Sequence, residues 1–117
     1  MSFIERIDTV CIKVRNIEES SLWYQEKLGF KVVYQGLSYR VLSIGDSSVP
    51  LTIEQDNDKT STSNQTYPIF FTKNIKETYQ SLKEKGVSCG EIQIDGVNNF
   101  FDFYDADGNK LQVCFWE

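Results

Sequence analysis

This sequence has few side chains of the types that most often act as metal ligands, nucleophiles or general bases. The chain has no histidine among its 117 residues, so it lacks the residue that proteins most often use as a metal ligand and as a general base near neutral pH. Its three cysteines, Cys11, Cys89 and Cys114, form no Cys-x-x-Cys pair. Without an imidazole to activate a thiol, we expect packed, reduced cysteines rather than a nucleophile, a zinc site or a disulfide framework.

One acidic segment, DADGN at 105–109, is similar to the start of a calcium-binding loop. Such a loop needs a glutamate at its twelfth position, and that position, counted from Asp105, is occupied by Trp116. Asp, Gly and Asn favour turn conformations. The segment is therefore predicted to be a tight turn between two strands.

Composition and charge narrow the classes of partner. Seventeen acidic against twelve basic residues give a net charge of −5, which opposes binding to nucleic acid or to anionic lipid. The apolar runs span only a few residues, so no membrane-spanning segment is predicted. The first residues, MSFIERIDTVCIKV, place acidic residues among apolar ones and do not have the pattern of a signal peptide. We therefore expect a cytoplasmic protein.

The sequence contains a short repeat, RNIEES at 15–20 and KNIKET at 73–78, that indicates the secondary structure around these residues. Each copy opens an apolar stripe with helical spacing, and each has an Asn cap followed three residues later by Glu, a pattern that satisfies the first amides of a helix. The stripes are Ile17, Ser21, Tyr24 and Leu28 in the first copy and Ile75, Tyr79 and Leu82 in the second. Gly29 and Gly86 are expected to end the two helices.

Strand-like segments surround each helix. One precedes each helix, at 9–14 and 69–71, and three follow it, at 30–35, 38–45 and 49–55 and at 87–94, 99–104 and 110–116. The polar stretch 56–66 has no periodicity and is predicted to be a linker. The sequence thus predicts one α+β domain over 1–117, built from two tandem βαβββ modules at about 5–55 and 67–117.

In each module the helix is expected to cover one face of the sheet. On the first strand the alternation assigns Val10, Ile12 and Val14 to the helix side, which leaves Thr9, Cys11 and Lys13 on the other. On the last strand Gln112, Cys114 and Trp116 are left in the same way. Two uncovered faces, curled edge to edge, would form a curved mixed β-sheet cleft with the helices on its outer face, a typical site for a small ligand.

The motifs VRNIEESSLWYQEKLGF at 14–30, TKNIKETYQSLKEKGV at 72–87 and FYDADGNKLQVCFW at 103–116 resemble those of the vicinal oxygen chelate superfamily, also called the glyoxalase/bleomycin resistance/dioxygenase superfamily. The resemblance runs from about Ile7 to Trp116. It implies the fold just described. It does not imply one activity, since the superfamily contains isomerases, dioxygenases, thiol transferases and non-catalytic drug-binding proteins.

Metal-dependent members of this family hold a divalent ion with four side chains, mostly His and Glu, on the first and fourth strands of each half. The resemblance places the histidine positions on Thr9 and Tyr67 and the closing-strand glutamate on Gln112. The fourth position falls within LTIEQ, where Thr52 and Glu54 share a face and either could correspond. One carboxylate with neutral oxygens suits no divalent ion well, so neither a metal nor another cofactor is predicted.

The candidates for a ligand pocket share either the uncovered face or an aromatic ring that could stack on a planar or cationic ligand. They are Thr9, Cys11, Tyr39, Thr52, Glu54, Tyr67, Phe71, Gln112, Cys114 and Trp116. No catalytic residue is assigned.

The function that we expect is metal-independent binding of a small organic molecule, such as sequestration of a drug or metabolite. Two alternatives remain open at this point. One is a glyoxalase-like lyase or dioxygenase-like enzyme with an atypical metal centre, in which Glu54 acts as base or ligand and Gln112 and Tyr67 polarise the substrate. The other is a non-catalytic accessory domain. The resemblance also implies a homodimer.

Overall fold

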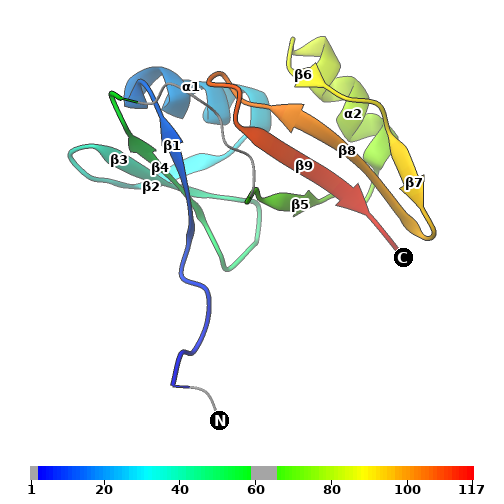
Figure 1. The fold of residues 1–117 in the computed structure, drawn as a ribbon, viewed down its shortest axis with the longest axis horizontal. Helices are drawn as coiled ribbons and strands as arrows, with labels where there is room; N and C mark the ends of the chain where they lie inside the picture. The colour runs from blue at the N-terminus through cyan, green and yellow to red at the C-terminus, as the bar shows by residue number, and fades with distance from the viewer. Residues whose placement is uncertain (1–2, 59–65) are drawn as a thin grey trace. The chain divides into compact units, whose positions relative to one another are not determined.

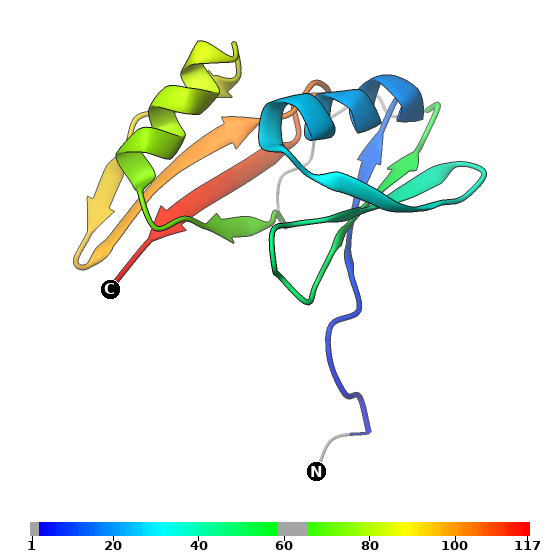
Figure 2. The same cartoon turned by 180° about the vertical axis from the view of Figure 1, so that it is seen from behind.

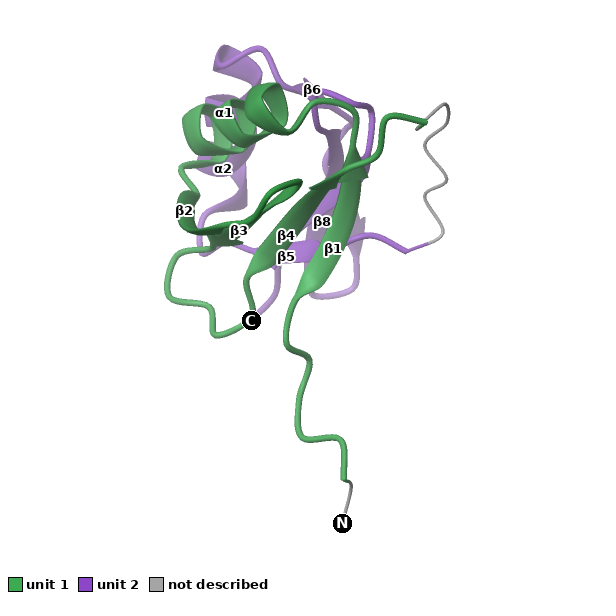
Figure 3. Ribbon diagram, turned by 90° about the vertical axis from the view of Figure 1, so that its left-hand side faces the viewer, with its two compact units in different colours: residues 1–59 green, residues 60–117 purple. Residues whose placement is uncertain are grey.

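The computed structural model describes residues 3–58 and 66–117. The chain divides into two units, residues 1–59 and 60–117 (Figure 3), and each is described by itself. The predicted linker, 56–66, lies largely outside the described residues. Unit 1 has the predicted βαβββ order, and unit 2 follows the same order with one additional strand. Each unit has a mixed sheet and one helix (Figure 1). The α+β class and the tandem arrangement are therefore confirmed.

Unit 1 contains β1 (Val10–Val14), α1 (Ile17–Leu28), β2 (Lys31–Gln35), β3 (Tyr39–Ser43) and β4 (Leu51–Gln55). Its strands lie in the order β1-β4-β3-β2, with β1 parallel to β4 and the other pairs antiparallel. The first and last strands of the unit are thus neighbours, which places the residues of β1 beside those of β4.

Unit 2 contains β5 (Ile69–Phe71), α2 (Ile75–Glu84), β6 (Ser88–Cys89), β7 (Gln93–Asp95), β8 (Asn98–Tyr104) and β9 (Lys110–Phe115). The order β5-β9-β8-β6 repeats that of unit 1, with β5 parallel to β9, and β7 also pairs with β8. The single strand predicted over 87–94 is therefore two short strands.

The helix caps form as the sequence predicts, with one difference. The Asn16 and Asn74 side chains accept hydrogen bonds from the backbone amides of Glu19 and Glu77 at 3.0 and 3.1 Å. The Glu77 carboxylate, however, accepts from the side-chain amide of Asn74 at 3.1 Å. The backbone amide of Asn74 donates instead to the hydroxyl of Thr72. Gly29 ends α1 in the left-handed conformation that glycine adopts most readily.

In each unit the helix lies over one face of its own sheet (Figure 2). In unit 1 the fully buried side chains between helix and sheet include Val14, Leu42 and Ile53 from the strands and Tyr24 from α1. In unit 2 they include Phe101 and Leu111, and Tyr79 of α2 meets Phe101 edge to face with ring centroids 5.0 Å apart. Burial of these groups supplies most of the free energy of folding. Among the described residues no helix is both long and apolar enough to span a membrane.

Candidate functional site

The candidate residues gather on the face of each sheet that its own helix does not cover, which we call the open face. In unit 1 the strand register puts Cys11 beside Thr52, Lys13 beside Glu54, and Tyr39 beside Glu54. In unit 2 it puts Ile69 beside Gln112 and Phe71 beside Cys114. The alternation that assigned these side chains opposite the helix therefore agrees with the pairing of the strands.

A pair of hydroxyls lies on the open face of unit 1. The Oγ1 atoms of Thr9 and Thr52 are 2.8 Å apart, and Thr9 also donates to the carbonyl oxygen of Pro50 at 3.0 Å. Because a hydroxyl has one proton, Thr52 donates to Thr9 when Thr9 donates to Pro50. Both threonines are thus held by neutral hydrogen bonds within the sheet.

The acidic candidate of unit 1, Glu54, forms an ion pair and a hydrogen bond with Lys13. Both side chains are substantially exposed, so the pair contributes little to stability. The ion pair has a larger consequence for the reactions that Glu54 could take part in, because its carboxylate already has a cationic partner.

The strand register also decides which residue of β4 corresponds to Gln112. Ile69, the partner of Gln112, follows Cys11 by 58 positions, the same offset that separates the caps Asn16 and Asn74. Cys11 pairs with Thr52. Thr52 rather than Glu54 is therefore the counterpart of Gln112 in the first unit.

Four polar side chains form a connected group on the open face of unit 2, which we call the amide cluster: Tyr67, Asp102, Lys110 and Gln112. Gln112 is buried, and its Nε2 donates to Oδ1 of Asp102 at 2.9 Å. Nζ of Lys110 lies 3.6 Å from the other oxygen of Asp102 and 4.2 Å from the centroid of the Tyr67 ring. Asp102 thus holds an amide on one side and a cation on the other.

Next to this cluster lies the aromatic patch, which consists of Ile69, Phe71, Cys114 and Trp116. The Phe71 and Trp116 rings meet edge to face at 5.6 Å, and each residue is more than half exposed (52% and 57%). Large aromatic side chains with such exposure offer apolar surface to a ligand. The open face of unit 2 is therefore polar at one end and aromatic at the other.

The thiols on the two open faces are not activated. Burial, together with the nearby Glu54 carboxylate, raises the pKa of Cys11, and Lys13 only partly offsets this. Burial raises the pKa of Cys114. Both groups are therefore protonated at neutral pH, which is not the state of a nucleophilic thiol. Cys114 is buried, as predicted, whereas Cys11 is exposed rather than packed.

Tyr39 of β3 lies on the open face of unit 1, beside Glu54. Its ring stacks on that of Tyr34 with centroids 5.9 Å apart, and a hydrogen bond with Tyr34 raises the pKa of Tyr39. Its phenol is therefore no acid or base near neutral pH.

The residues at the family's four metal positions do not fit a divalent ion. In unit 1 they are the hydrogen-bonded hydroxyls of Thr9 and Thr52. In unit 2 they are the phenol of Tyr67, under a lysine, and the amide of Gln112, bound to Asp102. None is a carboxylate, thiolate or imidazole. Within the described part of the chain, no group of three or more Cys, Asp or Glu is placed to hold a metal.

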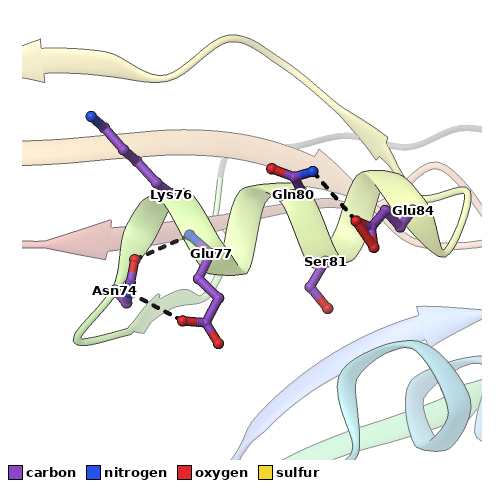
Figure 4. Close-up of a pocket in the computed structure, with 6 residues that line it drawn as sticks. All are labelled: Asn74, Lys76, Glu77, Gln80, Ser81 and Glu84. Carbon is purple, nitrogen blue, oxygen red and sulfur yellow. Dashed lines mark hydrogen bonds between the residues drawn. The ribbon is translucent and has the colours of Figure 1, made fainter.

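Two surface depressions lie away from the open faces, on α2. The larger, of about 460 Å³, is lined by Asn74, Lys76, Glu77, Gln80, Ser81 and Glu84 (Figure 4). The smaller, of about 320 Å³, shares Gln80 and Glu84. Asn74 bonds to Glu77, and Gln80 bonds to Glu84 at 3.4 Å. These depressions expose the solvated side of a helix and carry none of the candidate residues.

Asp102 and Lys110 are the members of the amide cluster that sequence reasoning did not assign to the site. The alternation that identified Gln112 on β9 extends to Lys110, two residues earlier. On β8 the buried Phe101 and Phe103 flank Asp102, so the same period of two assigns Asp102 to the open face. The signal was present, but the register that brings Asp102 opposite Gln112 depends on the fold.

Comparison with known proteins gives one family and a common fold. The model of the Glyoxalase/Bleomycin resistance protein/Dioxygenase superfamily matches residues 6–113. None of the curated proteins compared with the chain matches it.

Solved structures match over nearly the whole chain. One is an antibiotic binding protein, TnmS3, from Streptomyces sp. CB03234 (16% identity, TM-score 0.84, all of both chains covered). Another is a glyoxalase family protein from Enterococcus faecalis (23%, TM-score 0.81, 97% of this chain and 99% of that one). A third is a bleomycin resistance determinant encoded on the transposon Tn5 (18%, TM-score 0.80, 97% and 99%). At these identities the likeness shows the fold alone.

Proposed function

Because the chain belongs to the glyoxalase/bleomycin resistance protein/dioxygenase superfamily, we propose that it binds a small organic molecule on its open sheet faces without a metal ion. The observation that carries the proposal is the state of the family's metal positions. Thr9 with Thr52, and Gln112 with Asp102, form hydrogen bonds among themselves and offer neutral atoms to a ligand.

The lining of the open face of unit 2 supports ligand binding. Small-molecule sites combine apolar and aromatic surface with a few fixed polar groups. The aromatic patch, with Phe71 and Trp116 exposed, supplies the first. The amide cluster, with Gln112 fixed by Asp102, supplies the second.

Sequestration rather than turnover is the simplest use of such a face. Proton transfer in catalysis needs a group whose pKa lies near the working pH. The thiols of Cys11 and Cys114 have raised pKa values. Independently of any pKa, the carboxylate of Glu54 is occupied by an ion pair with Lys13. Two proteins of this fold are described as an antibiotic binding protein and a bleomycin resistance determinant, and we propose a similar role, with an antibiotic or a metabolite as the ligand.

A thermal-shift screen tests this function directly. A ligand at one hundred times its dissociation constant stabilises the folded protein by about 2.7 kcal/mol, so a panel of planar antibiotics and metabolites should contain compounds that raise the melting temperature by several degrees. Binding should then be measured by calorimetry on the metal-free protein. If no compound class raises the melting temperature and another protein co-purifies with the chain, the accessory-domain function replaces this one.

We also propose that two copies of the chain associate in the cytoplasm. Apolar side chains outside the sheets support association, since Phe3 and Ile7 in unit 1 are 97% and 67% exposed. The cysteines of the described residues are free thiols, as in a reducing compartment. Sedimentation equilibrium at micromolar concentration should give twice the mass of the 13.5 kDa chain, and a monomer would contradict the proposal.

A further inference from the structure

We propose that the open face of unit 2 selects uncharged planar molecules that carry an N–H or O–H donor, and that the carbonyl oxygen of Gln112 is the acceptor that recognises this donor. The inference rests on the proposed function and names the class of ligand for the same face. It follows from the direction in which Asp102 holds the Gln112 amide.

The orientation of the Gln112 side chain is fixed by charge. A carboxylate only accepts hydrogen bonds, so the side of the amide that faces Asp102 must be the NH₂ group, as the 2.9 Å contact between Nε2 and Oδ1 has it. The Oε1 atom is therefore directed away from Asp102. A charge-assisted hydrogen bond is about twice as strong as a neutral one, which opposes a flip of the amide.

The Oε1 atom of Gln112 is available to a ligand. Among the described residues, the one side-chain polar atom that is fully buried without a hydrogen-bond partner is Oδ1 of Asn98. Oε1 of Gln112 is therefore not such an atom. Gln112 is 8% exposed as a residue, and its side-chain hydrogen bond is the one that Nε2 donates to Asp102. Its carbonyl oxygen is thus an accessible acceptor at the edge of a largely buried amide, where a hydrogen bond to a ligand competes less with water.

The charge of the ligand is limited by Lys110. Asp102 is already engaged through both of its oxygens, by Gln112 on one and by Lys110 at 3.6 Å on the other. The lysine therefore keeps the carboxylate from attracting a second cation and repels a cationic ligand at the same place. An anionic ligand would be repelled by the carboxylate of Asp102, and also by the chain as a whole, which has a net charge of −5. An uncharged donor fits both constraints.

The flat part of the ligand has its own contact surface. Phe71 lies beside Cys114, the next residue of β9 on the open face after Gln112. Trp116 directly follows the end of β9, and its ring meets that of Phe71. A planar ring of two fused cycles that rests on Phe71 and Trp116 can thus direct a ring N–H toward Gln112. Aromatic contact supplies affinity that does not depend on the donor, so the two contributions can be measured separately.

The test uses indole and benzofuran, which have the same shape and differ by an N–H donor against a ring oxygen. Each is titrated into ¹⁵N-labelled protein, and the side-chain amide of Gln112 and the indole N–H of Trp116 are followed by NMR. A Trp23→Phe variant assigns the Trp116 signal. Since a net hydrogen bond favours binding by a factor that we take as about three to ten, indole should bind about three- to tenfold more tightly than benzofuran.

Three variants separate recognition from packing. Gln112→Met keeps the length of the side chain but has no acceptor, and it should bring the ratio of the two dissociation constants close to one while benzofuran still binds. Asp102→Asn removes the charge that fixes the amide, and it should lower the same ratio. Gln80→Met, the matched change on the exposed side of α2, should leave the ratio as in the wild type.

The outcomes distinguish this inference from the proposed function. If both probes shift the signals of Gln112 and Trp116 with equal affinity, or if Gln112→Met leaves the preference for indole unchanged, the selection by Gln112 is wrong and binding at this face stands. If neither probe shifts these signals and thermal-shift hits map elsewhere, the face is not the binding site and both proposals are wrong.

Discussion

Cys114 lies at the centre of the open face of unit 2, beside Phe71 on one neighbouring strand and Phe100 on the other. It is 9% exposed, and burial raises the pKa of its thiol. The unfolded chain exposes the same thiol to water, where its pKa has the ordinary value. The proton is therefore held more tightly in the folded protein than in the unfolded one, and the stability must depend on pH.

We predict that the stabilisation by Cys114 is fully present below its ordinary pKa of 9.0 and is lost as the pH rises through the higher folded pKa. In a Cys11→Ala, Cys89→Ala background, the free energy of unfolding is measured in urea with Cys114 and with Cys114→Ala. The difference between the two should be constant from pH 7 to 8 and should shrink above pH 9. A constant difference up to pH 10.5 would contradict the burial of the thiol.

The face on which each candidate residue lies could be predicted from the period of two along a strand. The partner of each residue could not. Thr52 and Glu54 lie on the same face of β4, and only the pairing of β4 with β1 shows that Thr52 corresponds to Gln112 while Glu54 meets Lys13. A period of two carries no information on register.

At the scale of elements, Arg40 connects α1 to the sheet of unit 1. The side chain is buried on the helix side of β3, where its Nη1 donates to the carbonyl oxygens of Gly36 and Tyr39 at 3.1 and 3.0 Å. Its Nη2 donates to Glu18 in the first turn of α1 at 2.7 Å. Since a buried guanidinium needs partners for its donors, this contact fixes the start of the helix on the sheet.

Arg40→Met is predicted to lower the free energy of unfolding by about 1–3 kcal/mol, because two carbonyl oxygens lose a charged donor. Glu18→Gln should cost less than about 1 kcal/mol, since Glu18 is mostly exposed and water replaces the lost interaction. Urea unfolding monitored by circular dichroism gives both values. Arg6→Met, which removes an exposed arginine that pairs with Asp8, is the control. Equal losses for Arg40→Met and Arg6→Met would show that Arg40 has no such role.

The helices could be predicted well because their signals are local. The caps at Asn16 and Asn74, three residues before Glu19 and Glu77, need no information from distant residues. The strand predicted over 30–35 forms as β2, but the strand predicted over 87–94 forms as β6 and β7. In each unit this segment has one extra residue relative to the neighbouring strand, between Val32 and Tyr34 in unit 1 and between Cys89 and Gln93 in unit 2. Such bulges depend on the pairing with the neighbouring strand, and no residue type at these positions predicts them.

At the scale of the whole molecule, the two units preserve one plan and differ in chemistry. Both have the capped helix, the parallel pairing of first and last strands, and the extra residue after the helix. Their open faces differ, since unit 1 has a threonine pair where unit 2 has Tyr67 and an amide fixed by Asp102. Backbone pairing maintains the fold and leaves the open faces free to change, which explains why membership of the superfamily does not determine the activity.

The metal independence of the whole protein is the prediction that most directly separates binding from metal-dependent catalysis. The purified chain, incubated with excess nickel, zinc, iron(II) or manganese and then desalted, should retain well under one equivalent of any of them. EDTA should leave the melting temperature unchanged, because a chelator lowers the stability only where the folded state binds the metal.

Zinc needs a control of its own, since exposed thiols bind it without a site. The zinc measurement is therefore repeated with Cys11→Ala, Cys89→Ala. One equivalent of metal that survives desalting in this variant, raises the melting temperature and is lost on Thr52→Val or Gln112→Met would contradict metal independence. Those residues would then act as ligands despite their neutral oxygens, and an enzyme with an atypical metal centre would become the better account of the chain. Retention that disappears with the cysteines would leave the binding function in place.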